Sequence, residues 1–250
     1  MTNPMKKLIQ TNLILILFFL IFTANAQLST AYDEDGYTNI RQTPSVKSKI
    51  IGKILEGQVF KINYFFEEEN KNTEWVKIEF PINPDPKIND YIKCLGTNEE
   101  GFIHRSRIRN LEDLKQFKVN KINSYKVELK ESGFTVVIET KPFNKSTHKI
   151  KHFNNRTTID NEIPWGYFEH FETTEIKSIS VKKDSVTYIF PKNSFSNLYH
   201  ISTEFAQVAI GNKNEIYITI IGGDGSDTYN AIWCIKNNKI FSMTVVNAVP

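Results

Sequence analysis

The 250-residue chain carries 31 basic and 28 acidic residues, so its formal net charge is only +3. This balance supplies no concentrated basic face of the kind that nucleic-acid-binding proteins use, and nucleic acid is therefore not an expected partner. Hydrophobic residues make up 40% of the chain, and its length is enough for one or two globular domains.

Residues 1–26 have the pattern of a secretory signal peptide. Lys6 and Lys7 form a basic start, residues 13–22 are an unbroken apolar run, and Ala24-Asn25-Ala26 has the small-x-small form of a cleavage site. An uncleaved anchor is the alternative, but a spanning helix needs about 20 apolar residues, roughly twice this run. The sequence therefore predicts an exported protein, periplasmic or extracellular, with no stable membrane insertion after cleavage. Loss of the two lysines lowers the formal charge to +1.

Residues 31–110 form a first predicted domain, which is rich in β-strands. The strands are expected at 37–41, 50–55, 59–62, 75–78 and 101–104, with Ile108 as the last core residue. Between Phe80 and Gly101 lie twenty residues with three prolines, which favour an exposed loop, and residues 91–95 are a candidate added strand. Two interpretations of this insertion stay open: a tolerated surface loop, or a loop that shapes a ligand groove.

The order of short motifs in this domain resembles that of a bacterial SH3 domain over about a third of the chain. The motifs are Asp35–Arg41, Thr43-Pro44-Ser45, Ile50–Ile54, Glu56-Gly57, Trp75–Ile78 and Gly101–His104. The resemblance implies a small, half-open β-barrel used outside the cytoplasm to bind cell-wall or protein ligands. The candidate ligand-binding residues are Tyr37, Tyr64, Trp75 and Tyr91, although packing inside the barrel is the favoured role for Trp75.

Residues 111–120 are a predicted linker with room for one helical turn, and residues 121–250 are a second, β-rich domain that resembles no family we can name. Residues 191–199 are expected to form a short helix capped by Asn193 or Ser194. The other predicted elements are strands at 125–129, 134–139, 150–153, 175–181, 186–190, 215–221, 228–235 and 239–246. The expected fold class is mainly β: an N-terminal SH3-like barrel followed by an antiparallel β-sandwich or curved sheet with one short helix.

Neither cysteine has the surroundings of a catalytic nucleophile. Cys94 lies in or just after the inserted loop and Cys234 lies in a predicted strand, whereas a papain-like nucleophile stands at the start of a helix. We expect two buried, apolar thiols. A disulfide between the domains is the alternative, and it requires Cα atoms within about 7 Å of each other.

Two other patterns suggest a metal, and each has a simpler interpretation. His148 and His152 are four residues apart but lack the intervening Glu of a metalloprotease signature, so a solvated basic strand is expected. Gly222 to Asp227 has the glycines and aspartates of a calcium loop without its downstream Glu, which is typical of a hairpin turn. No catalytic residue, metal site or cofactor is therefore predicted.

The expected function is that of an exported, non-enzymatic binding protein whose SH3-like domain recognises peptidoglycan or an envelope protein. Two alternatives remain: an envelope inhibitor or immunity protein directed against a toxin or hydrolase, and an enzyme with its site in residues 121–250. The enzyme alternative predicts that Glu162, His170, Asp224 or Asp227 gather in one pocket.

Overall fold

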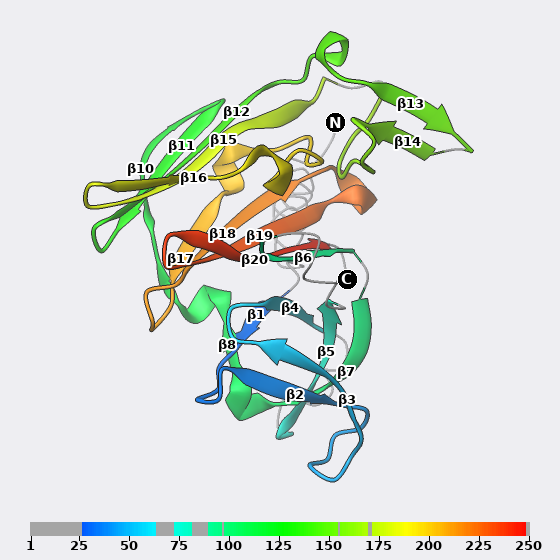
Figure 1. Cartoon of the computed structure of the whole chain (residues 1–250), viewed down its shortest axis with the longest axis vertical. Helices are drawn as coiled ribbons and strands as arrows, with labels where there is room; N and C mark the ends of the chain where they lie inside the picture. Colours follow the sequence, from blue (N-terminus) through cyan, green and yellow to red (C-terminus); the bar gives the residue numbers. More distant parts are fainter. Residues whose placement is uncertain are drawn as a thin grey trace, which may run out of the picture.

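The protein is mainly β, as the sequence predicts (Figure 1). The computed structural model describes residues 27–63, 73–81, 90–96, 98–154, 156–169 and 172–248, so the predicted signal peptide lies outside the described residues. The helical segments in these ranges are single 3-10 turns of three residues. No helix within them is long and apolar enough to cross a bilayer.

Seven strands form an antiparallel sheet that we call the N-terminal unit, at the bottom of Figure 1. Their order across the sheet is β3-β2-β7-β5-β4-β1-β8. The strands are β1 (Leu28–Ala31), β2 (Tyr37–Arg41), β3 (Ile50–Leu55), β4 (Val59–Ile62), β5 (Trp75–Pro81), β7 (Asn98–His104) and β8 (Ile108–Asn110). Every strand predicted for residues 37–104 is confirmed, whereas β1 was not anticipated.

Alternating apolar residues give the N-terminal unit its own core. Ile40, Ile54 and Val76 are buried in one cluster, and Ile108 packs against it. Trp75 is not part of this cluster, so the role favoured for it by the sequence is wrong. Its neighbour Val76 points into the core, and successive side chains of a strand point to opposite faces, so Trp75 lies on the outer face.

The sheet of the N-terminal unit is not a closed barrel. β2 and β7 share a single registered pair, Arg41 with Phe102, and the strand order ends in two edge strands, β3 and β8. The turn between β3 and β4 behaves as expected, because Gly57 has a φ of 97°, which only glycine adopts at little cost.

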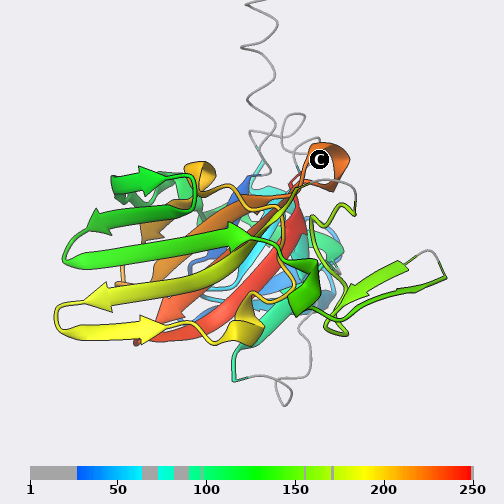
Figure 2. The same ribbon diagram turned by 90° about the horizontal axis from the view of Figure 1, so that it is seen from above.

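The rest of the chain forms two sheets that pack face to face, seen from above in Figure 2, and we call this pair the sandwich. The five-stranded sheet contains β10 (Lys118–Asn123), β11 (Lys126–Glu131), β12 (Phe134–Pro142), β15 (Thr174–Lys183) and β16 (Val186–Ile189). The six-stranded sheet contains β6 (Ile92–Leu95), β20 (Lys239–Asn247), β19 (Tyr229–Lys236), β18 (Ile216–Gly222), β17 (Gln207–Ile210) and β9 (Lys115–Gln116).

A separate hairpin, β13 (Ile150–Phe153) with β14 (Arg156–Ile159), projects from the side of the sandwich. Figures 1 and 2 both show it standing away from the body of the molecule, and we call it the arm. The sequence predicted its first strand and not its second.

The helix predicted at residues 191–199 is absent from the structure. A 3-10 turn at Lys192–Ser194 stands there instead, with Pro191 rather than Asn193 or Ser194 at the cap position. In the chain that follows, Phe195, Leu198 and Tyr199 are buried, and Leu198 forms a β-bridge with Trp165. The Asn197 carbonyl and the Tyr199 N–H bond to the backbone of Trp165, so these groups are not available for the hydrogen bonds of a regular helix.

The six-stranded sheet is buried on both faces, because it also covers the N-terminal unit. Ile218 and Trp233 point into the sandwich core, whereas Tyr217, Ile232 and Cys234 belong to a second cluster that includes residues of the N-terminal unit. Hydrogen bonds join the same surfaces: Tyr217 OH to Thr30 Oγ1 (3.3 Å), Ser242 Oγ to the Gly57 carbonyl (2.6 Å) and Thr244 Oγ1 to the Val59 carbonyl (3.2 Å). The two parts are therefore packed together, not tethered.

Two segments cross the boundaries that the sequence suggested. β6, from the insertion between β5 and β7, pairs in parallel with β20 in the sandwich. The predicted linker, residues 111–120, supplies β9, which pairs with β17, and the start of β10. Its only helical piece is the 3-10 turn Leu111–Asp113.

Both cysteines are buried and free, so the simpler expectation for them is confirmed. Burial raises the pKa of the Cys94 thiol to about 12, and it does the same for the Cys234 thiol. The thiolate is the reactive form of cysteine, so both side chains are expected to be inert in the folded protein.

We predict that iodoacetamide at about pH 8 leaves both thiols unmodified in the native protein and alkylates both after denaturation in urea. Intact-mass measurement before and after denaturation checks this. Modification of either cysteine in the native protein would show that its surroundings are more open than the structure has them.

Candidate functional site

The predicted ligand-binding aromatics are only partly brought together. Tyr37 and Trp75 both lie on the outer face of the N-terminal unit, because each alternates with a core residue on its strand. Tyr91 lies elsewhere: it packs against the sandwich core, and burial, with Glu162 nearby, raises its pKa to about 12. Tyr64 lies outside the described residues.

Each of the two outer-face aromatics has a partner that holds its ring. The Nζ of Lys53 lies 4.1 Å from the ring centre of Tyr37. The ring of Trp75 meets that of His104 edge to face, with 5.5 Å between centres. The Nδ1 of His104 in turn lies 2.8 Å from Ser106 Oγ. These contacts limit the rotamers of both rings, which lowers the entropy lost when a ligand binds.

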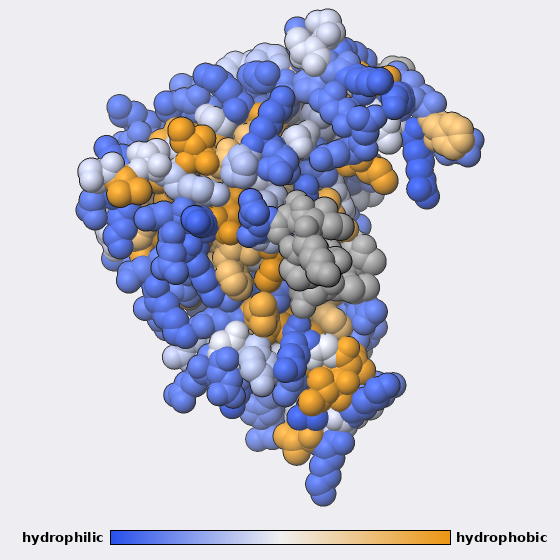
Figure 3. Space-filling model, viewed as in Figure 1, coloured by the Kyte–Doolittle hydropathy of each residue, from blue (hydrophilic) through white to orange (hydrophobic). Residues whose placement is uncertain are grey.

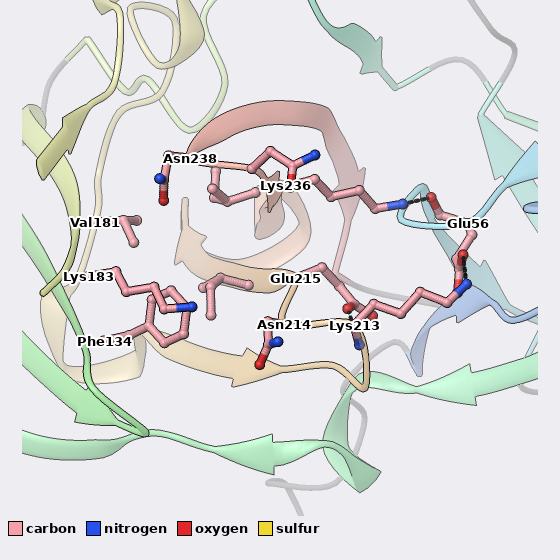
Figure 4. A pocket seen from close by; sticks show the side chains of 12 residues that line it. Glu56, Phe134, Val181, Lys183, Lys213, Asn214, Glu215, Lys236 and Asn238 are labelled. Carbon is pink, nitrogen blue, oxygen red and sulfur yellow. Dashed lines mark hydrogen bonds and ion pairs between the residues drawn. The ribbon is translucent and has the colours of Figure 1, made fainter. Parts of the chain in front are cut away.

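The second candidate site is a cavity of about 440 Å³ at one end of the sandwich, which we call the junction cavity (Figure 4). One wall comes from the five-stranded sheet and another from two turns of the six-stranded sheet. Glu56 of the N-terminal unit completes the rim. The lining residues are Glu56, Phe134, Val181, Lys183, Lys213, Asn214, Glu215, Ile216, Ile235, Lys236, Asn237 and Asn238.

Asparagines shape the two turns at the junction cavity. Asn237 and Asn238 have φ of 52° and 56°, as the turn between β19 and β20 requires, and Asn214 has φ of 61° in the turn before β18. Asparagine tolerates this left-handed conformation better than most residues, which accounts for its repeated use here. The turns also leave three side-chain amides at the cavity.

Ion pairing at the junction cavity centres on Glu56. Its carboxylate lies 2.7 Å from the Nζ of Lys213, and its backbone carbonyl accepts a hydrogen bond from the Nζ of Lys236. Glu215 accepts a hydrogen bond from the backbone N–H of Lys213 (2.9 Å). The Nζ of Lys183 lies over the Phe134 ring, 4.6 Å from the ring centre, and the Nζ of Lys236 lies over the Phe241 ring at 4.2 Å.

The histidines that suggested a metal have separate roles. The His148 side chain is buried at the base of the arm, with Nδ1 2.8 Å from Asp160 and Nε2 3.2 Å from Glu175. A hydrogen bond from the backbone N–H of Lys149, followed by the bond to His148, lowers the pKa of Asp160. Both ring nitrogens of His148 are thus occupied by carboxylates, whereas His152 lies on the arm, 3.8 Å from Glu169.

The aspartate-rich loop forms a turn, as expected. The side chain of Asp224 accepts a hydrogen bond from the Gly225 N–H (2.8 Å) and caps the 3-10 turn Gly225–Asp227. Glu162 accepts one from Ser196 Oγ (3.3 Å). None of Glu162, Asp224 and Asp227 lines the junction cavity, the cavity beside the arm or the cavity beside His200, and His170 lies outside the described residues.

The junction cavity is not evident from the sequence. Its walls come from five segments spread between residues 56 and 238, and only their fold brings them together. The asparagine-rich turn at 237–238 was the one local signal. Comparison with family models, with curated proteins and with solved structures gives no match for this chain.

Proposed function

We propose that the protein is an exported, non-enzymatic binding protein whose N-terminal unit, an SH3-like module, recognises peptidoglycan or an envelope protein. The observation that carries the proposal is the outer face of this unit, where Tyr37 and Trp75 are half-buried beside the cationic or polar side chains of Lys53 and His104. Aromatic rings held by neighbours are the commonest anchors in binding surfaces. The motif order and the leader at residues 1–26 support an envelope ligand.

The arm favours a second candidate function, that of an envelope inhibitor or immunity protein. Phe153 near its tip is 76% exposed, Lys151 and Arg156 lie on its two strands, and Lys149 directly precedes the first strand. Figure 3 shows an apolar group at the end of the arm, among hydrophilic residues. An exposed aromatic on a projecting hairpin is suited to insertion into a partner's cleft. Co-purification of one stoichiometric protein, lost on Phe153→Ala, would favour this candidate over wall binding.

Retention on purified cell-wall sacculi tests the leading proposal. The mature chain, residues 27–250, should be used intact, because a fragment ending near residue 115 would expose the apolar surface that the six-stranded sheet covers. We expect the double substitution Tyr37→Ala and Trp75→Ala to weaken retention by about tenfold or more, since truncating an aromatic anchor costs more than about 1 kcal/mol.

The matched control is Tyr125→Ala, which removes a tyrosine that is 47% exposed between β10 and β11 of the sandwich. This variant should bind sacculi as the parent protein does. If the parent protein is not retained, wall binding is wrong; if the double variant is retained equally well, the outer face is not the binding surface.

A further inference from the structure

The junction cavity lies apart from the outer face of the N-terminal unit, and wall recognition there leaves it without a role. Its volume of about 440 Å³ falls in the range of small-molecule sites, which is roughly 300 to 1,000 Å³. Such sites combine an apolar lining with a few convergent polar groups. The junction cavity has both an apolar lining and convergent polar groups, and different walls supply them.

The charge balance of the junction cavity favours an anionic group. Three lysines face two glutamates, and Glu56 is engaged by Lys213 and Lys236. Glu215 is tied to the backbone of Lys213. Among the described residues, no carboxylate lies within ion-pair distance of Lys183 or Lys236. The Nζ of Lys236 is held by the Glu56 backbone carbonyl, so Lys183 is the one lysine of this cavity whose Nζ has no hydrogen-bond or ion-pair partner in the described chain. A cation beside an apolar wall binds a carboxylate more strongly than one in open water.

The remaining lining limits the shape of such a ligand. Phe134, Val181, Ile216 and Ile235 provide apolar surface next to Lys183. The amides of Asn214, Asn237 and Asn238 supply hydrogen-bond donors and acceptors at the two turns. Figure 4 shows Lys183 and Phe134 on one side of the cavity, with Asn238 and Asn214 at its upper and lower edges. A single carboxylate, a short apolar side chain and backbone amides would match these three features together.

We propose that the junction cavity binds the free carboxylate end of a short peptide whose last side chain is small and apolar. Lys183 pairs with the terminal carboxylate, the asparagine amides bind the peptide backbone, and the last side chain packs against Val181 and Ile216. This inference goes beyond the proposed function and uses none of the outer-face residues.

Calorimetry with the intact mature chain tests the inference, with N-acetyl-trialanine as the probe and the same peptide ending in an amide as its neutral counterpart. We expect the peptide with the free carboxylate to bind, and the peptide amide to bind with an affinity lower by about tenfold or more. Added salt should lower the affinity of the peptide with the free carboxylate. Lys183→Met keeps the aliphatic stem and should lower affinity for the acid about tenfold or more, whereas Lys183→Arg should stay within a few-fold of the parent.

Lys182→Met is the matched control, because Lys182 is the adjacent, exposed lysine on the opposite face of β15 and should leave binding unchanged. Equal binding of acid and amide, full affinity in Lys183→Met, or no binding of the acid at millimolar concentration would overturn the inference. Retention on sacculi should be unaffected by Lys183→Met. Loss of retention in the outer-face double variant with peptide binding intact would likewise separate the two sites.

Discussion

Replacing Trp233 by alanine is expected to lower the free energy of unfolding by about 3–5 kcal/mol. Trp233 is fully buried between the two sheets of the sandwich, its ring meets Phe190 edge to face, and its Nε1 donates a hydrogen bond to the Ser194 carbonyl (3.1 Å). The substitution leaves a large cavity and an unpaired carbonyl. Urea denaturation followed by far-ultraviolet circular dichroism measures the loss.

Two variants separate packing from the hydrogen bond at this position. Trp233→Phe retains most of the apolar volume and loses the bond to Ser194, so a smaller loss of about 1–2 kcal/mol is expected. Trp75→Ala removes the same side chain from the outer face of the N-terminal unit and should cost less than about 1 kcal/mol. Equal losses at positions 75 and 233 would contradict the assignment of Trp233 to the core.

The second large effect is expected at the contact between the N-terminal unit and the sandwich. Tyr217 is buried there with Val59, Leu111 and Ile232, and burial raises its pKa. Tyr217→Ala should cost about 3–5 kcal/mol, in line with other deletions of large buried aromatics. It should also split the unfolding curve, because the N-terminal unit then loses support that the sandwich supplies.

The parent protein is expected to unfold in one transition. Thermal unfolding curves from calorimetry and from circular dichroism, compared with each other, show whether Tyr217→Ala broadens or divides this transition. Tyr217→Phe removes only the hydroxyl and its 3.3 Å bond to Thr30, so a loss of about 1 kcal/mol and a single transition are expected. A single, unshifted transition in Tyr217→Ala would show that the Tyr217 contact does not contribute to the stability of the fold.

Local turn chemistry explains why most hairpins were predictable from the sequence. Ser132 and Gly133 have φ of 49° and 80°, and Asp184 has φ of 54°, in the turns expected between β11 and β12 and between β15 and β16. Small polar residues and glycine accept such values, and apolar alternation marks the flanking strands. Turn residues and apolar alternation can both be recognised within a few neighbouring residues of the sequence.

Tertiary packing decides the features that the sequence did not reveal. Strands β18, β19 and β20 are apolar on both faces, so their composition marks them as strands without saying which sheet covers each face. The side chains of residues 111–120, the predicted linker, are mostly exposed, and only the pairing of β9 with β17 shows where this segment belongs. The junction cavity depends on such pairings at every wall.

The crossing of β6 into the sandwich limits how this architecture could be rearranged. β6 precedes β7, which lies inside the sheet of the N-terminal unit, yet its only strand partner in the described chain is β20, close to the carboxyl end. A gene fragment that ends at residue 110 would encode β6 without the sheet to which it belongs. The remaining fragment would encode the six-stranded sheet without β6, its edge strand. Neither the N-terminal unit nor the sandwich can therefore be transferred complete to another protein by a single cut and fusion of the gene. We expect the two parts to evolve together.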